Sequence, residues 1–519
     1  MTNSESATDE LDHKHVNRRW LALGVLSLAL FMASLDNTIL NVALPTLARE
    51  LQATTSQLQW TVDSYQVTFA GLLLVAGAFV DRWGRTKTFI TGAAVFGVFS
   101  LLAGLAPNAE WLIIFRALMG VGAALLTPST LALVSAIFRD PKERTLAFAI
   151  WSGANAAGGA AGPLLSGILL EHFSWGSIFF INVPVALIIV LVGPFVLQNF
   201  QPDSNLQGID IVGALLSTSA LALVCWAVIS APELGLLSLP ILGSFVLGMG
   251  LAVGFICWEA NFSAPILDLS LFKNRRFTVA VSVAGLVTGS GSAALFILTQ
   301  YLQFNLAYGP LESGIRILPV ALALGLAVAC APKLINTLKL KNTVLIGLVL
   351  VAAGFFWLSM VTVESTYIHM LIGALLFGLG AGLLNPAATQ AVMDALPGWA
   401  SGVGSATNSS IMQVGSAVGV AFGGAMLSTR YQNMISNSSI FDQLGDFKQT
   451  VLDSYAGAAE AAQNFPSEMA DKIIHLAKAG FVDGMSWALI GCGGAVLLAA
   501  VAVAILYPKD KKTENTEDA

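Results

Sequence analysis

Three ionisable side chains lie inside long apolar stretches of the chain. Asp36 belongs to the segment Leu35–Pro45, Asp63 to Trp60–Tyr65, and Arg116 follows the start of another apolar run. A charged group within a membrane is unfavourable unless it is paired, hydrated or protonated. Asp36 is therefore a candidate proton carrier, and Arg116, at a similar depth, is its candidate partner. Pairing and separating the two would couple proton uptake to a conformational change.

Each of these residues also has a simpler interpretation. Asp36 could be an interfacial residue that touches water, and Arg116 could extend its guanidinium to the membrane surface. Asp63 could bind a cation or carry a second proton, or it could be a hydrated residue at a channel mouth. If Asp36 and Asp63 face one cavity, two carboxylates there favour cationic substrates.

Signs of enzyme chemistry and of bound cofactors are missing from the sequence. The five histidines are scattered, and no two cysteines have C-x-x-C spacing, so we predict no metal site. There is no phosphate-binding glycine loop and no H-E-x-x-H zinc motif. We predict a chain without a cofactor that is not an enzyme.

The composition requires a membrane environment for these residues. Of 519 residues, 56% are apolar and 11% are charged, whereas soluble domains have about 25% charged residues. This excludes a soluble globular protein and a disordered one. The apolar residues form long runs, which disfavours the alternating strands of an outer-membrane barrel. The net charge of −6 gives no indication of nucleic-acid binding.

The apolar runs predict an all-α polytopic membrane protein with fourteen transmembrane helices. An even number of spans places both termini on the same side of the membrane. Most Lys and Arg fall on that side, which predicts that both termini are cytoplasmic. We therefore predict a multi-pass protein of the plasma (inner) membrane. The expected spans are 20–40, 58–80, 88–106, 111–135, 145–170, 177–198, 209–229, 238–258, 277–302, 313–335, 341–361, 367–388, 403–428 and 485–507.

An internal repeat divides these spans. Leu118–Pro128 resembles Leu376–Pro386, and Gly158–Gly162 resembles Gly415–Gly419. Both matches imply a shift of eight spans, so the predicted arrangement is six spans, two inserted spans and six more. The expected divisions are a tail at 1–19, a six-helix bundle at 20–200, two inserted helices at 201–262, a second bundle at 263–507 with an outer loop at 429–484, and a tail at 508–519. Within that loop, 442–478 is expected to form one or two short amphipathic helices as a spacer or cap.

Two segments of small and charged residues belong to the first repeat. The segment Gly77–Lys87 predicts a tight loop between spans, and glycines in the span 145–170 recur on one helix face beside a proline that can bend it. A positively charged loop and a merely packed, bent helix are the simpler interpretations. Arg116, Asp81 and Pro163 have no counterpart in the second repeat, which favours a mechanistic role. The candidate residues are Gly77, Asp81, Arg82, Gly84 and Arg85 in the loop, and Gly153, Gly158, Gly162, Pro163 and Gly167 in the helix.

Taken together, these motifs resemble the major facilitator superfamily, and within it the fourteen-span drug:proton antiporters of the EmrB/QacA type. The resemblance covers nearly the whole chain; Ser166, Gly176 and Ser177 depart from the usual residues. It implies a major facilitator fold with proton-coupled export of lipophilic, often cationic, drugs or self-made antibiotics. It also implies a coupling role for Asp36 and Arg116, a conformational role for the 77–87 loop and an antiporter motif at 153–167. The implied partners are a small-molecule drug, protons and membrane lipid.

Two alternatives remain beside multidrug export. One is a dedicated exporter of a single metabolite or self-made antibiotic, which competition by unrelated lipophilic cations would distinguish. The other is a membrane sensor or scaffold without transport activity, which a flux measurement would distinguish. The sequence gives no prediction of the oligomeric state.

Overall fold

The computed structural model describes residues 2–138, 140–197, 210–262, 267, 269–394 and 401–506, and every regular element in them is a helix. Within these helices, the side chains of 2–17, 74, 78, 81, 141, 142, 145, 393, 394 and 401–406 lie outside the description. The first repeat comprises α1 (Thr2–Glu50), α2 (Thr55–Trp83), α3 (Arg85–Gly104), α4 (Ala109–Ile137), α5 (Pro141–His172), α6 (Ser177–Phe180) and α7 (Asn182–Val196).

The remaining helices follow in the expected order. Two helices, α8 (Ile211–Leu234) and α9 (Leu239–Asn261), precede a short 3-10 turn η1 (Leu269–Lys273). The second repeat comprises α10 (Arg275–Phe304), α11 (Pro310–Leu338), α12 (Leu340–Leu358), α13 (Tyr367–Asp394), α14 (Ser401–Ser436) and α17 (Ser467–Leu506).

Polar side chains cap the starts of two helices in the first repeat, α2 and α4. Thr54 and Gln57 form a reciprocal capping box at the start of α2, and the Asn108 side chain accepts the Trp111 amide at the start of α4. Gly84, with φ of 98°, makes the turn between α2 and α3. A left-handed backbone of this kind favours glycine, so the tight loop predicted at 77–87 has its turn at Gly84.

Twelve candidate membrane spans occur among the described residues, with α6 and α7 counted as one. The other two expected spans, 58–80 and 145–170, fall on α2 and α5. α2 carries several polar side chains, and α5 is rich in glycine and alanine, which lowers the apolar content of both. The count of fourteen and the six-two-six division therefore stay predictions.

Glycine contacts show that the two repeats pack in the same way. A methyl group added at Gly158 of α5 would overlap the Phe31 carbonyl of α1, and one added at Gly415 of α14 would overlap the Gly285 carbonyl of α10. These glycines therefore let the paired helix backbones touch. The matching segments of α4 and α13 likewise pack between the second and third helices of their repeats. The internal repeat inferred from the sequence is thus a structural repeat.

The helix α8 lies where the two repeats meet. It packs against both α2 and α14, while α9 packs against α8. An apolar cluster joins Val67 and Ala70 of α2, Leu221 and Cys225 of α8, and Ala417 of α14. Most of α9 is exposed, and an apolar exposed helix of this kind is expected to face lipid.

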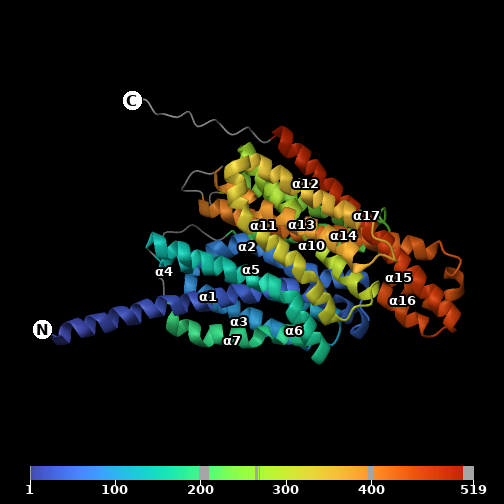
Figure 1. Cartoon of the computed structure of the whole chain (residues 1–519), viewed down its shortest axis with the longest axis horizontal. Helices are drawn as coiled ribbons and strands as arrows, with labels where there is room; N and C mark the ends of the chain where they lie inside the picture. Colours follow the sequence, from blue (N-terminus) through green and yellow to red (C-terminus); the bar gives the residue numbers. More distant parts are fainter. Residues whose placement is uncertain are drawn as a thin grey trace.

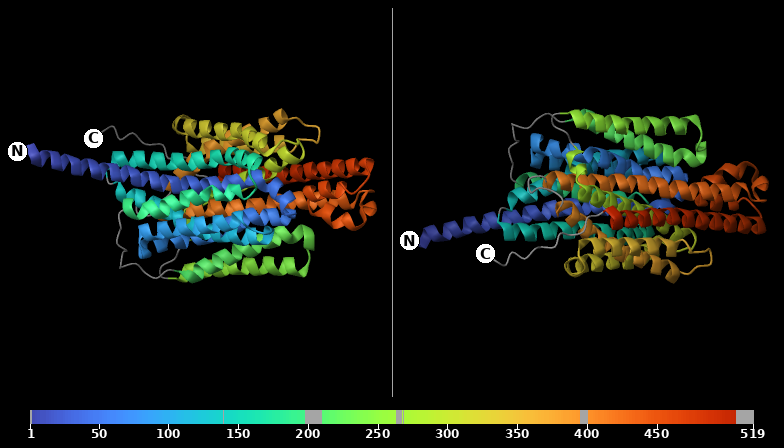
Figure 2. Two further views of the ribbon diagram at one scale, coloured as in Figure 1. Left: turned by 90° about the horizontal axis from the view of Figure 1, so that it is seen from below. Right: turned by 90° about the horizontal axis from the view of Figure 1, so that it is seen from above.

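The expected outer loop at 429–484 is shorter than predicted because the flanking helices continue through much of it. α14 extends to Ser436 and α17 begins at Ser467; between them lie η3 (Phe441–Phe447), α15 (Lys448–Asp453) and α16 (Tyr455–Ala462). We call η3, α15 and α16 the cap. Figures 1 and 2 show the cap at one end of the molecule, opposite the start of α1 and the end of α17. The Tyr431 hydroxyl of α14 donates to the carbonyls of Val451 and Ser454, which anchors the cap.

Candidate functional site

Asp36 and Arg116 form an ion pair inside the first repeat. Arg116 Nη1 lies 2.5 Å from Asp36 Oδ2, and the two side chains are 1% and 0% exposed. Because neither reaches the surface, the interpretations as a hydrated aspartate and a surface-seeking arginine are wrong. A buried ion pair is retained only when its partners satisfy each other, since each charge alone is strongly unfavourable there.

The guanidinium of Arg116 is held in position by α2. Its Nε donates to the carbonyl oxygen of Thr61 at 3.1 Å, and its central carbon lies 4.4 Å from the centre of the Tyr65 ring. A cation over an aromatic face gains electrostatic attraction in a dry environment. The arginine is thus fixed between α1 and α2, although it is carried by α4.

Asn182, at the start of α7, donates a hydrogen bond to the other carboxylate oxygen of Asp36. Its Nδ2 donates to Asp36 Oδ1 at 3.0 Å and to Ser100 Oγ at 3.1 Å, and Ser100 donates to the Phe179 carbonyl. The sequence analysis missed Asn182 as a site residue. The available signal was an amide side chain in the apolar run Phe179–Val185. Asp36 therefore accepts one hydrogen bond from a charged donor and one from a neutral donor.

Asp63 occupies a different environment from Asp36. Its side chain is fully buried, and neither carboxylate oxygen has a hydrogen-bond partner among the described residues. It lies one turn before Val67, which belongs to the apolar cluster of α2, α8 and α14. The interpretation as a hydrated mouth residue does not hold in this conformation.

The two carboxylates do not face one cavity. Thr61 and Tyr65 of α2 contact Arg116, whereas Asp63 lies between them in sequence. Two residues correspond to about 200° around a helix, so Asp63 points away from the ion pair. α2 therefore separates the buried Asp36–Arg116 ion pair inside the first repeat from a lone carboxylate beside α8 and α14.

The glycine motif of α5 has two packing faces. Gly158 and Gly162 pack on α1. Gly167 packs on α11 instead: a methyl group added there would lie 2.5 Å from Leu311 Cα and 2.8 Å from the Pro310 carbonyl oxygen. A side chain on Gly314 of α11 would in turn overlap the Pro163 carbonyl. We call this contact between the repeats the α5–α11 seam. Gly153 contacts nothing at its Cβ position.

A second contact between the repeats lies across the bundle. Gln59 Nε2 of α2 donates to the carbonyls of Val420 and Ala421 in α14, at 3.4 and 3.2 Å, and its side chain lies over Gly424. We call this contact the α2–α14 seam. Gly167 and Gly424 occupy matching positions in the repeat, so the two seams are equivalent. In addition, Gln303 of α10 donates to the Val42 carbonyl of α1 at 2.7 Å.

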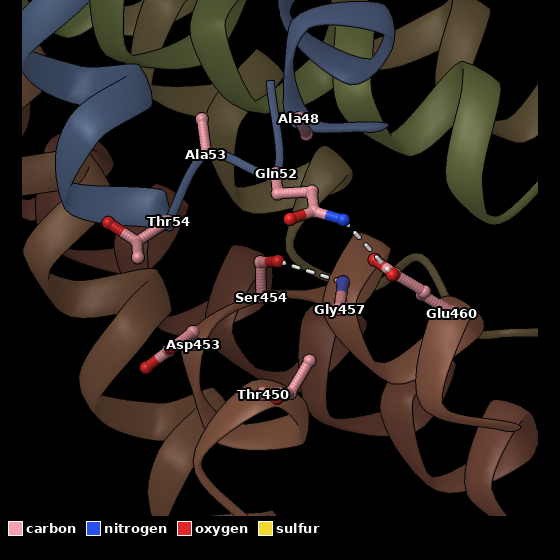
Figure 3. Close-up of a pocket in the computed structure, with 9 residues that line it drawn as sticks. All are labelled: Ala48, Gln52, Ala53, Thr54, Thr450, Asp453, Ser454, Gly457 and Glu460. Carbon is pink, nitrogen blue, oxygen red and sulfur yellow. Dashed lines mark hydrogen bonds between the residues drawn. The ribbon is translucent and has the colours of Figure 1, made fainter. Parts of the chain in front are cut away.

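The cap adds contacts at the same end of the molecule. Thr55 Oγ1 donates to the Asp453 carbonyl at 2.8 Å, and Gln52 donates to Glu460 across a cavity of about 240 Å³ (Figure 3). Burial raises the pKa of the Asp453 carboxyl, and the hydrogen bond from Gln449 opposes that effect. The cap thus links the second repeat to the turn between α1 and α2.

The 77–87 loop is only partly described. Gly84 forms its turn, Arg82 is exposed, and Arg85 Nη1 donates to the Ala132 carbonyl of α4 at 3.4 Å. Gly77 contacts nothing at its Cβ position. The Asp81 side chain lies outside the described residues, so its role in the loop stays a prediction.

In this arrangement, separating Asp36 from Arg116 would leave each buried charge without its partner. Among the described residues, no group of three or more His, Cys, Asp or Glu is placed to hold a metal ion. The buried ion pair, the lone carboxylate and the glycine seams are therefore the features that a function must use.

Comparison with known proteins gives consistent matches along the chain. Residues 26–420 match the family described as the Major Facilitator Superfamily. The chain is 33% identical over 500 residues to the multidrug efflux pump LfrA of Mycolicibacterium smegmatis, covering 94% of this chain and 96% of that protein. It is 33% identical over 494 residues to the methyl viologen resistance protein SmvA of Salmonella typhimurium, covering 94% and 98%.

A solved structure supports the fold alone. The bacterial homologue of the human lysosomal transporter Spinster, in an inward-facing and unoccupied conformation, is similar with a TM-score of 0.66. The match covers 94% of this chain and 96% of that one at 14% sequence identity.

Proposed function

The chain belongs to the Major Facilitator Superfamily, and from this premise we propose that it exports lipophilic, cationic drugs in exchange for protons. It is a membrane transport protein rather than an enzyme, and relatives named for multidrug efflux and methyl viologen resistance support drug efflux. We assign it to the fourteen-span EmrB/QacA type with six, two and six spans. The single observation that supports proton coupling most strongly is the buried Asp36–Arg116 pair.

In the coupling step, Asp36 either pairs with Arg116 or binds a proton. While Arg116 lies beside it, the opposite charges of the two side chains compensate each other. When α4 and α1 move apart, the isolated carboxylate takes up a proton, because an uncompensated charge in this dry interior is strongly unfavourable. A proton taken up on the outside and released on the inside drives the export of drug by alternating access.

The substrate interacts with Asp63 in this proposal. A buried carboxylate without a hydrogen-bond partner is available to a cation when the neighbouring helices separate. It lies among α2, α8 and α14, so both repeats and the inserted pair surround it. Asp63 thus meets the positive charge of the drug or carries a second proton, while Asp36 and Arg116 couple transport to the proton gradient.

The orientation follows from the basic residues. The cap lies opposite the start of α1 (Figure 1), and it contacts Thr55, about one helical turn from Gln59 of the α2–α14 seam. Basic loops place the start of α1 in the cytoplasm. The seams therefore close the outer side of a protein of the plasma membrane, and the 77–87 loop lies on the cytoplasmic side. The outer seams must open to release drug, and the 77–87 loop controls the inner side.

A panel of drugs tests this function directly. Cells that express the chain should survive several chemically unrelated lipophilic cations, and everted vesicles should lose part of an imposed proton gradient when such a drug is added. A vesicle population that accumulates drug equally with and without a proton gradient would contradict proton coupling. Resistance to one compound, without competition by the others, would identify a dedicated exporter.

A further inference from the structure

A cavity of about 640 Å³ lies outside the site described above. Its lining comes from Glu171 of α5, from Gly309–Glu312, Ile315, Arg316 and Pro319 of α11, and from Tyr367 of α13. None of these residues contacts Asp36, Arg116 or Asp63. The cavity lies at the outer end of the α5–α11 seam, so one of its walls belongs to the first repeat and the others to the second.

The polar rim of this cavity is held in a fixed geometry. Arg316 Nη2 lies 2.5 Å from Glu312 Oε1, and its guanidinium lies 3.9 Å from the Tyr308 ring centre and 4.7 Å from that of Tyr367. The Tyr367 hydroxyl donates to the Arg316 carbonyl at 2.8 Å. The arginine therefore stays at the rim instead of extending freely into solvent.

Glu171 supplies a second carboxylate from the opposite wall. It is exposed, and no residue in the described part of the chain forms a hydrogen bond or an ion pair with it. The rim thus combines two carboxylates with one guanidinium. A ligand that carries a positive group beside a negative one matches this arrangement, whereas a purely anionic ligand is repelled by the net negative charge.

Below the rim, the surface is apolar and continues along α11. Ile315 is 50% exposed, and Leu322 and Leu326, further along the same helix, are 73% and 64% exposed. Their spacing of seven, then four residues keeps them on one helix face. The polar rim therefore lies at one end of a row of exposed apolar side chains on α11.

We propose that this cavity binds a phospholipid with a primary ammonium headgroup. The ammonium group donates hydrogen bonds to Glu171, the phosphate lies beside Arg316, and an acyl chain follows Ile315 and Leu322. A quaternary ammonium headgroup has no N–H to donate and binds less well. Because Glu171 belongs to the first repeat and Arg316 to the second, the bound lipid bridges the seam and favours its closed state. This site is independent of which drug is transported.

Native mass spectrometry of the full chain tests lipid selection. Phosphatidylethanolamine, phosphatidylcholine and phosphatidylglycerol with identical acyl chains are titrated onto wild type and onto Glu171→Gln. We expect wild type to retain the ethanolamine lipid about fivefold better than the other two, as one partly exposed charged contact allows. Glu171→Gln should lose that preference. The control Glu468→Gln removes one exposed carboxylate near the cap and should keep it.

A second measurement tests the bridge across the seam. Spin labels at the exposed positions Trp111 and Met360 report the distance between the outer ends of the repeats. Vesicles of ethanolamine lipid should raise the population of the short distance in wild type but not in Glu171→Gln. Equal retention of all three lipids, a preference that survives Glu171→Gln, or binding of a lipophilic cation in place of lipid would each overturn the proposal.

Discussion

The clearest single test of alternating access is Gly167→Ala in the α5–α11 seam. The added methyl group would lie 2.5 Å from Leu311 Cα and 2.8 Å from the Pro310 carbonyl oxygen. Ordinary contact between carbon atoms is about 3.5–4.0 Å. Both neighbours are backbone atoms of α11, so the helices must move apart by about 1 Å.

The size of the effect follows from this overlap. Overpacking of a tight contact costs about 1–3 kcal/mol. Because Leu311 belongs to the other repeat, this cost applies only to the state in which the outer seam is closed. The variant should therefore shift the equilibrium toward the outward-open state by about 5- to 150-fold.

Two matched variants separate this effect from misfolding. Gly424→Ala lies at the equivalent position, but the added methyl group meets side-chain atoms of Gln59 instead of helix backbone. It should cause a smaller shift. Gly162→Ala overlaps α1 within the same repeat, so it should lower thermal stability without moving the equilibrium.

Pulsed electron resonance between labels at Trp111 and Met360 measures the shift. The labels require a background in which Cys225, Cys257, Cys330 and Cys492 are replaced. Gly167→Ala should populate the longer distance. An unchanged distance distribution in a folded Gly167→Ala protein, or an equal shift from Gly162→Ala, would refute the reasoning.

Three further predictions concern single side chains. Asp63→Asn should weaken resistance to dicationic drugs far more than to monocationic ones and least to neutral ones, at matched membrane expression; equal losses for all three classes would place Asp63 in coupling or folding. Arg116→Ala should lower the free energy of unfolding by about 3–5 kcal/mol, because Asp36 is left buried and unpaired. Adding Asp36→Asn to this variant should recover part of that loss in thermal unfolding, and no recovery would contradict an ion pair between the two residues. Tyr431→Phe should speed hydrogen exchange in 448–462, since two carbonyls lose their donor at about 1–2 kcal/mol; unchanged exchange would show that the hydroxyl does not anchor the cap.

The sequence was sufficient to find the ion pair because charged residues are rare in apolar helices. In the expected spans 20–40 and 111–135, Asp36 and Arg116 lie at similar distances from the ends on one side of the membrane, so depth alone suggested the contact. The glycine repeats were predictable for a related reason, since backbone contact between helices restricts side-chain size at fixed spacing. The pairing of α5 with α1 and of α14 with α10 follows that pattern.

Other features depend on helix rotation and tertiary packing, which spacing alone does not determine. The rotation of α2 turns Asp63 toward α8 instead of toward Arg116. The two carboxylates therefore do not share a cavity, an arrangement that the sequence had left open. Asn182 is polar but uncharged, so it carried a weaker signal than Asp36. Short helices were expected within 442–478, but the sequence did not predict the tertiary contacts that stabilise them, such as that of Tyr431.

The measurement that tests proton coupling most directly compares wild type with Asp36→Asn in proteoliposomes. An asparagine keeps the size of the side chain and can still accept a hydrogen bond, but it cannot exchange a proton. Wild type should release protons from the acidic compartment when drug is added and should accumulate drug in response to an imposed pH gradient. Asp36→Asn should bind drug and remain folded, yet show neither response. Normal drug-induced proton movement in the variant would contradict the assignment of Asp36 as the coupling residue.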